Sequence, residues 1–228
     1  MKKEGRNTQE VGGGVRPLFS ELPTTEARGE DILLIYEKAG MSWAVNEHSV
    51  AVAFHARALA KAMAVQETAF LRDLEMGALL HDIGKIGVPA RILSKCGPLT
   101  PAERNIVREH PVAGYILISH FEHLRGAARV VLHHHERFDG RGYPFGLSGN
   151  AIPLSARIFA LADALDAMTS DRPYRRGRSF AFARGEIARC RGTQFDPDVV
   201  DAFLGAPAVV WTSPFDGARP ARSSRWVH

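Results

Sequence analysis

Histidine and aspartate residues in the middle of the chain recur at positions that helical periodicity places on inward faces or at helix ends. The pair His81-Asp82, in the run Leu-His-Asp-Ile-Gly-Lys, follows a stripe made by Phe70, Leu74 and Ala78. His81 should therefore point inward, with Asp82 beside it. Desolvating a carboxylate is costly unless a partner compensates its charge, and a divalent metal is a common partner where imidazoles gather. The pair therefore suggests a metal site.

The other histidines turn this suggestion into a prediction of a metal centre. A catalytic site with one metal typically uses three protein ligands, so a larger set predicts two metals that share a bridging carboxylate. The nitrogen and oxygen ligands at inward or helix-end positions are His48, His81, Asp82, His110, His134 and His135, together with Asp163 or Asp166.

Helices must position these residues, because apolar side chains recur at helical spacing and no stretch alternates as a strand does. The predicted class is all-α. Helices are expected in a short segment from the apolar run 32–35, near residues 48–63, through residue 81, from residue 100 toward 110, over 127–135, over 155–168, and as a pair over 180–204.

Local signals predict several helix ends. Thr100 is an expected N-cap, and Glu103 completes a capping box with it. Gly84 and Gly87 are expected to end the helix before them. Ser155 is expected to cap the apolar helix that carries the two candidate aspartates.

Composition limits the classes of protein to consider. A length of 228 residues with 45% apolar residues suits one domain, expected over 29–205, with a leader over 1–28 and a tail over 206–228. No apolar run approaches the roughly 20 residues needed to span a bilayer, so a cytoplasmic protein is expected. Two cysteines form neither a disulfide framework nor a zinc spacing. A net charge of +4 is weak support for nucleic acid, and no DNA binding is expected.

Five short motifs, taken in order, resemble one known family. The motifs are His81-Asp82-Ile83-Gly84-Lys85, His134-His135-Glu136-Arg137, Gly142-Tyr143-Pro144, Ser170-Asp171-Arg172-Pro173-Tyr174-Arg175 and Thr193-Gln194-Phe195-Asp196-Pro197. With them the chain from Glu47 to Phe203 resembles the HD-GYP domain, a branch of the HD metal-dependent phosphohydrolases. The resemblance implies an all-helical domain of about seven helices around a buried centre, usually of iron or manganese, that hydrolyses the bacterial second messenger cyclic di-GMP.

The resemblance also implies a role for each ligand. It selects Asp163 over Asp166, and it makes Asp82 the carboxylate that bridges two divalent metals. A hydroxide between these metals is the expected nucleophile, because metals lower the pKa of bound water toward 7. One metal is expected to bind His110, His134 and His135, and the other His48, His81 and Asp163.

The resemblance implies contacts to the substrate as well. Lys85 is expected to act with Asp82 in catalysis by contacting a phosphate. Arg172 and Arg175 match basic residues near the same phosphates, and Tyr143 matches a loop tyrosine that lines the substrate pocket. The loop that carries Gly142-Tyr143-Pro144 is also a candidate contact for other signalling proteins.

One position departs from the family pattern. Some members carry a glutamate four residues before the first histidine ligand, where it helps to hold a third metal, but this chain has Ala44. We therefore expect two metals unless Glu47 or another carboxylate substitutes, and linear pGpG rather than GMP as the main product. His55 is the main rival ligand on the helix of His48. His55, His120, His123 and His133 are interpreted as structural or solvent-facing.

Two alternatives remain open from the sequence. An HD-type hydrolase of mononucleotides or of another cyclic dinucleotide would use the same metal chemistry. A non-catalytic receptor, which binds cyclic di-GMP or a partner protein, would be expected to lack metal ligands, and none of the seven is missing. The sequence does not indicate the oligomeric state.

Overall fold

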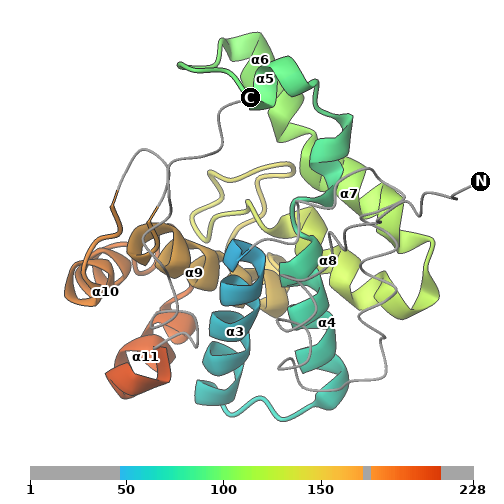
Figure 1. Ribbon diagram of the computed structural model, residues 1–228. Helices are drawn as coiled ribbons and strands as arrows, with labels where there is room; N and C mark the ends of the chain where they lie inside the picture. Colours follow the sequence, from blue (N-terminus) through green and yellow to red (C-terminus); the bar gives the residue numbers. More distant parts are fainter. Residues whose placement is uncertain (1–46, 172–175, 212–228) are drawn as a thin grey trace, which may run out of the picture.

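Helices joined by turns and loops make up the regular structure of residues 47–171 and 176–211, which are the residues that the computed structural model describes (Figure 1). Within these ranges the β-type pairing is limited to two isolated bridges, Asp139–Ser148 and Arg191–Phe195. The predicted all-α class is confirmed. No helix in the described ranges combines the length and the apolarity that crossing a membrane requires.

Several predictions concern residues outside the described ranges. These are the leader 1–28, the short helix from 32–35, the departure at Ala44, the basic residues Arg172 and Arg175, and the tail from residue 212 onward.

The described helices follow one another with short connections. In chain order the α-helices are α3 (Glu47–Ala62), α4 (Thr68–Leu80), α5 (Ala90–Leu93), α6 (Pro101–Arg108), α7 (His110–Ser119), α8 (Arg125–His133), α9 (Leu154–Thr169), α10 (Phe180–Arg189) and α11 (Pro197–Gly205). The 3₁₀ turns are η1 (Ile83–Gly87), η2 (Glu122–Leu124), η3 (Gly149–Ala151) and η4 (Ala208–Trp211).

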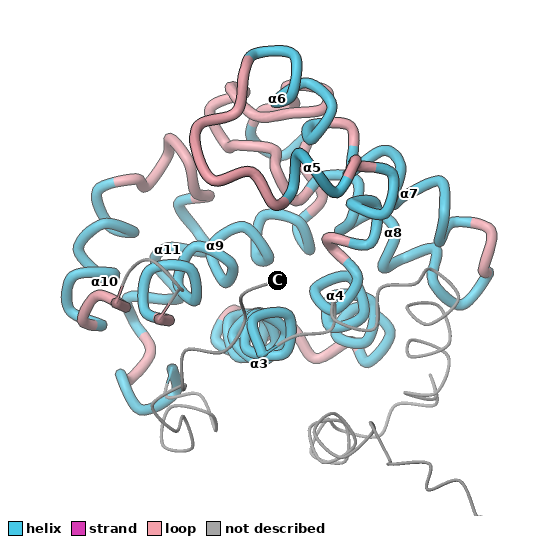
Figure 2. The backbone as a smooth tube through the Cα atoms, turned by 45° about the horizontal axis from the view of Figure 1, so that its top comes forward, coloured by secondary structure: helices cyan, strands magenta, loops and turns pink. Residues whose placement is uncertain are grey.

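The core lies where α3, α4, α8 and α9 pack against one another. Figure 2 views α3 nearly end-on, with α9 and α4 on either side of it. Leu59 of α3, Leu74 of α4 and Phe159 of α9 are fully buried, and burying each such side chain contributes roughly 1.5–3 kcal/mol. Apolar residues of α9 point in nearly every direction and none of its residues is exposed, so this helix can carry aspartates into the interior.

Two predicted helix starts have different outcomes. The capping box of α6 is confirmed, because Thr100 Oγ1 accepts the Glu103 N–H and the Glu103 carboxylate accepts the Thr100 N–H. The predicted Ser155 cap is wrong. The carbonyl of Pro153 already accepts the first backbone bonds of α9, at 3.0 and 3.1 Å, so the N-cap lies two residues earlier and Ser155 lies inside the first turn.

The predicted ends of α4 and α8 are also corrected. Helix α4 stops at Leu80, and Gly84 and Gly87 lie in the 3₁₀ turn η1 rather than at its end. Gly84 serves close packing instead, because a Cβ at this position would meet the backbone oxygen of His110 at 1.9 Å. Helix α8 covers 125–133 instead of 127–135, so His134 and His135 follow the helix as a turn.

The folded part continues beyond residue 205, where the tail was expected to begin. Turn η4 brings Trp211 into the core, where it is 3% exposed and its ring lies 4.9 Å from that of Phe203.

Candidate metal centre

Three helices end at the site, and each supplies a histidine at or just beyond its last turn. In each case the imidazole Nδ1 lies within hydrogen-bond distance of a carbonyl oxygen three residues earlier. A carbonyl can only accept, so the proton is on Nδ1 and the Nε2 lone pair points away from the helix. The pairs are His81–Ala78 (2.8 Å) after α4, His110–Val107 (2.6 Å) after α6 and His134–Val131 (2.7 Å) after α8.

This arrangement serves both the helices and the site. Carbonyls in the last turn of a helix have no partner within the helix, and the imidazoles supply one. Helices α4 and α8 direct the negative ends of their dipoles toward His81 and His134, which favours a cation there, whereas α7 begins at His110. Fixing Nδ1 also sets the tautomer and orientation that a metal-binding Nε2 needs.

The first group of potential ligands consists of His110, His134 and His135. The Nε2 atoms of His110 and His134 face each other at 3.0 Å, although the Nδ1 atoms of both rings already carry the protons. Burial lowers the pKa of His110, and it lowers the pKa of His134 well below its usual range. Burial and the neighbouring His110 lower the pKa of His135 to about 4. Three neutral imidazoles with converging lone pairs fit a metal ion.

The second group consists of His48, His81 and Asp163. His48 Nε2 lies 3.2 Å from Asp163 Oδ1, and the imidazoles of His48 and His81 meet edge to face at 5.5 Å. Burial alone would lower the pKa of His48, but hydrogen bonds to Asp163 and Asp166 raise it to about 9. The protonated imidazole of His48 thus places a positive charge between the carboxylates of Asp163 and Asp166.

Asp166 belongs to this arrangement, although sequence reasoning set it aside as a ligand. Its Oδ2 lies 2.6 Å from His48 Nδ1, on the opposite side of the ring from Asp163. Its other oxygen accepts a hydrogen bond from Ser170 at 2.6 Å. Asp166 therefore positions the imidazole of His48, which is a potential ligand. Two carboxylates three residues apart on a buried helix were the sequence signal for this pairing.

Asp82 lies between the two groups. Its Oδ1 is 3.6 Å from His110 Nε2 in the first group, and its Oδ2 is 3.4 Å from His81 Nε2 in the second. Burial would raise the pKa of Asp82, but His81 and Lys85 hold it well below its usual range. Lys85 Nζ is 2.6 Å from Oδ2, so its ammonium contacts the carboxylate directly.

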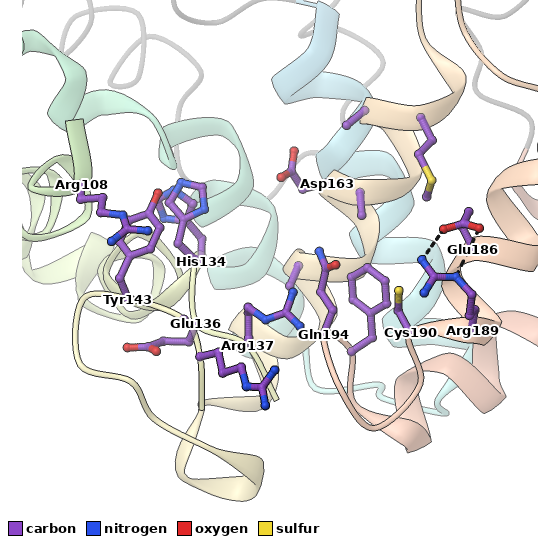
Figure 3. Close-up of a pocket in the computed structure, with 18 residues that line it drawn as sticks. Arg108, His134, Glu136, Arg137, Tyr143, Asp163, Glu186, Arg189, Cys190 and Gln194 are labelled. Carbon is purple, nitrogen blue, oxygen red and sulfur yellow. Dashed lines mark hydrogen bonds and ion pairs between the residues drawn. The ribbon is translucent and has the colours of Figure 1, made fainter. Parts of the chain in front are cut away.

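A cavity of about 570 Å³ opens beside these groups, within the size range of ligand pockets. His134, His135 and Asp163 line it, whereas Lys85 does not. The Tyr143 ring also lines it and stacks on the His135 imidazole at 4.6 Å, with 25° between the planes. Figure 3 shows Tyr143 and Arg108 beside His134 at one end of the pocket, and the Glu186–Arg189 pair at the other.

The family model described as the HD domain matches residues 30–199, which is most of the chain. The chain belongs to the HD domain family. HD-domain phosphohydrolases depend on metal ions, and the two groups above, found among the described residues, could bind such ions.

Among known proteins, this HD domain is 47% identical over 136 residues to the cyclic di-GMP phosphodiesterase response regulator RpfG of Xanthomonas campestris pv. campestris, covering 59% of this chain and 36% of that one. It is 42% identical over 161 residues to a cyclic di-GMP phosphodiesterase of Thermotoga maritima, covering 70% and 44%. The chain thus spans less than half the length of these relatives.

A solved structure supports the fold. The cyclic GMP-AMP-specific phosphodiesterase V-cGAP3 of Vibrio cholerae aligns with a TM-score of 0.57 and 18% identity, over 77% of this chain and 47% of that one. At this identity the likeness concerns the helical fold.

Hydrogen bonds to His135 and Glu136 attach the loop that carries Tyr143 to the segment 134–136 of this HD domain. The buried carboxylate of Glu136 accepts the backbone N–H groups of Phe145 at 2.8 Å and Leu147 at 3.1 Å. The Tyr143 N–H donates to the carbonyl of His135 at 3.2 Å. A Cβ on Gly142 would lie 2.4 Å from the backbone nitrogen of Arg137, so only glycine permits this approach. In the sequence, Glu136 is part of the motif His134-His135-Glu136-Arg137, which does not indicate this role.

The other candidates belong to neither group. His55, the rival ligand, is buried against Phe54, and Glu47 is exposed at the first residue of α3. His120 and His123 are exposed, and His133 is partly buried near Phe145.

Proposed function

We propose that this HD domain is a cyclic di-GMP phosphodiesterase with two divalent ions, iron or manganese, in its centre. The observation that carries the proposal is the position of Asp82, whose two oxygens face two separate groups of ligands. The cavity beside them offers room for a nucleotide substrate. The names of the two sequence relatives support cyclic di-GMP as the substrate.

Each set of residues would have a separate role in hydrolysis. Two ions in this centre would neutralise charge on the phosphate and lower the pKa of water, which removes the need for a protein base. The last-turn carbonyls and Asp166 hold the imidazoles in the metal-binding tautomer. Lys85 would turn from Asp82 toward a phosphate, and Arg172 and Arg175 would add positive charge near it.

A second class of function is a receptor that binds cyclic di-GMP or a partner protein without hydrolysis. The loop of Gly142-Tyr143-Pro144 is the proposed surface for signalling partners in either case. We favour the enzyme because His48, His81, Asp82, His110, His134, His135 and Asp163 come together.

The metal-loaded protein is expected to convert cyclic di-GMP into pGpG, with slow or absent release of GMP. A linear product brings an additional terminal phosphate charge, and Ala44 cannot hold a third cation to balance it. Chromatography of a time course under anaerobic conditions, with iron or manganese, measures both products.

Two comparisons test this expectation. Ala44→Glu should raise the yield of GMP. Rapid GMP formation by the unchanged protein, with no pGpG intermediate, would contradict the product assignment. Absence of any turnover by a protein that holds its metals would contradict the enzymatic function and favour the receptor.

A further inference from the structure

Four arginines in the described ranges line the cavity, and they divide into two kinds. Arg137 forms a two-pronged ion pair with Asp139, at 3.1 and 2.7 Å, and Arg189 pairs with Glu186 at 2.7 Å. Arg108 and Arg141 make no ion pair within the described ranges. Neither guanidinium therefore contacts a described carboxylate directly, although, after the hydrogen bond from Arg137, the nearby charge of Arg141 also lowers the pKa of the Asp139 carboxyl.

Arg108 is held over the cavity by an aromatic ring. It is the last residue of α6, and its guanidinium lies over the Tyr143 ring, 5.1 Å from the centroid. Tyr143 in turn stacks on His135. Since His135 covers one face of the tyrosine ring, Arg108 lies on the other. The Tyr143 ring therefore lies between the guanidinium and His135, a candidate metal ligand, and all three residues line the cavity. Figure 3 shows Arg108 beside Tyr143 on this wall.

Arg141 is placed by the loop that carries Tyr143. Its backbone N–H donates to Asp139 Oδ1 at 3.1 Å, and the next residue, Gly142, packs against the backbone of Glu136 and Arg137. The position of its Cα is thereby determined, while its side chain is exposed at the cavity.

We propose that Arg108 and Arg141 bind the non-scissile phosphate of the substrate. This inference rests on the proposed function, because a cyclic dinucleotide carries two phosphodiesters and only one can lie at the metals. The second must occupy a different part of the cavity. A guanidinium is a planar fork that binds two phosphate oxygens at once, and ring stacking leaves its N–H edge available. Tyr143 then serves as the platform that positions Arg108.

Steady-state kinetics of the metal-loaded protein tests the subsite with two substrates. Arg108→Ala and Arg141→Ala should each raise the KM for cyclic di-GMP roughly tenfold, with kcat changed much less, because a charge-assisted contact made throughout the reaction is lost. Bis(4-nitrophenyl) phosphate has a single phosphodiester, so its KM should change far less in the same variants. Arg104→Ala is the matched control, because Arg104 lies on the same helix, is exposed and bonds to the Leu99 carbonyl away from the cavity.

The two substrates distinguish a failure of the subsite inference from a failure of the proposed function. A KM for cyclic di-GMP that stays unchanged in both variants would overturn the inference alone. A loss of kcat without a rise in KM would also overturn it, since Arg108 would then act only by supporting Tyr143 and His135. An unchanged protein that cleaves bis(4-nitrophenyl) phosphate but not cyclic di-GMP would overturn the proposed function and the subsite with it.

Discussion

Replacing Asp82 by alanine is expected to abolish turnover of cyclic di-GMP, with a fall in kcat/KM of at least about 1,000-fold. Asp82 is the one described carboxylate whose oxygens face both groups of ligands, so both ions would lose it at once. The helices should remain, because their packing rests on buried apolar residues such as Leu74 and Phe159. Turnover is measured together with far-ultraviolet circular dichroism.

Asp201→Ala is the matched control. Asp201 pairs with Arg191 on the surface, at 2.8 and 2.7 Å, and does not contact the centre. Its loss should leave kcat/KM unchanged. Activity like that of the unchanged protein in the Asp82→Ala variant would show that the centre is assigned wrongly.

Gly84→Ala is expected to combine a loss of stability with a loss of metal binding. The new Cβ would lie 1.9 Å from the His110 oxygen and 2.5 Å from the Gly114 nitrogen, both of them backbone atoms of α7. Backbone cannot rotate away as a side chain can, so α7 must shift. We expect a cost of about 3 kcal/mol or more in the free energy of unfolding. His110 would move with the helix, which should weaken the first group of ligands.

Gly87→Ala provides the comparison within the same 3₁₀ turn. A Cβ at Gly87 would meet nothing within 4 Å, so its unfolding midpoint and activity should match those of the unchanged protein. Denaturant unfolding and a chelator competition measure the two effects. If the Gly84 and Gly87 variants behaved alike, the close contact between η1 and α7 would not be what positions His110.

Sequence patterns predicted the features that depend on interactions between residues close together in the chain. The capping box at Thr100 and Glu103 involves residues three apart, and it forms as expected. Helical periodicity placed His81 inward, and it is 4% exposed. The apolar pattern of α9 also indicated burial on nearly all sides, so the two aspartates on this helix stood out as residues that need partners.

The remaining features depend on contacts between distant segments. Asp166 orients His48 across 118 positions of sequence, and no local pattern distinguishes that role from a ligand's. Gly84 has the local pattern of a helix terminator, and its packing role follows only from its contact with α7. Helix α8 ends at His133, before its apolar pattern ends, and the imidazole of His134 then binds the Val131 carbonyl. The stacking of Arg108 on Tyr143 joins two segments that the sequence keeps apart.

The metal content of the protein tests the central claim most directly. After anaerobic reconstitution with iron or manganese and removal of loosely bound ions, elemental analysis should give about two ions per chain, one for each group of ligands joined by Asp82. A value near three would contradict the expected two-metal site and show that another carboxylate binds the third metal, which Ala44 cannot do. A value of zero with full folding retained would contradict the metal centre itself.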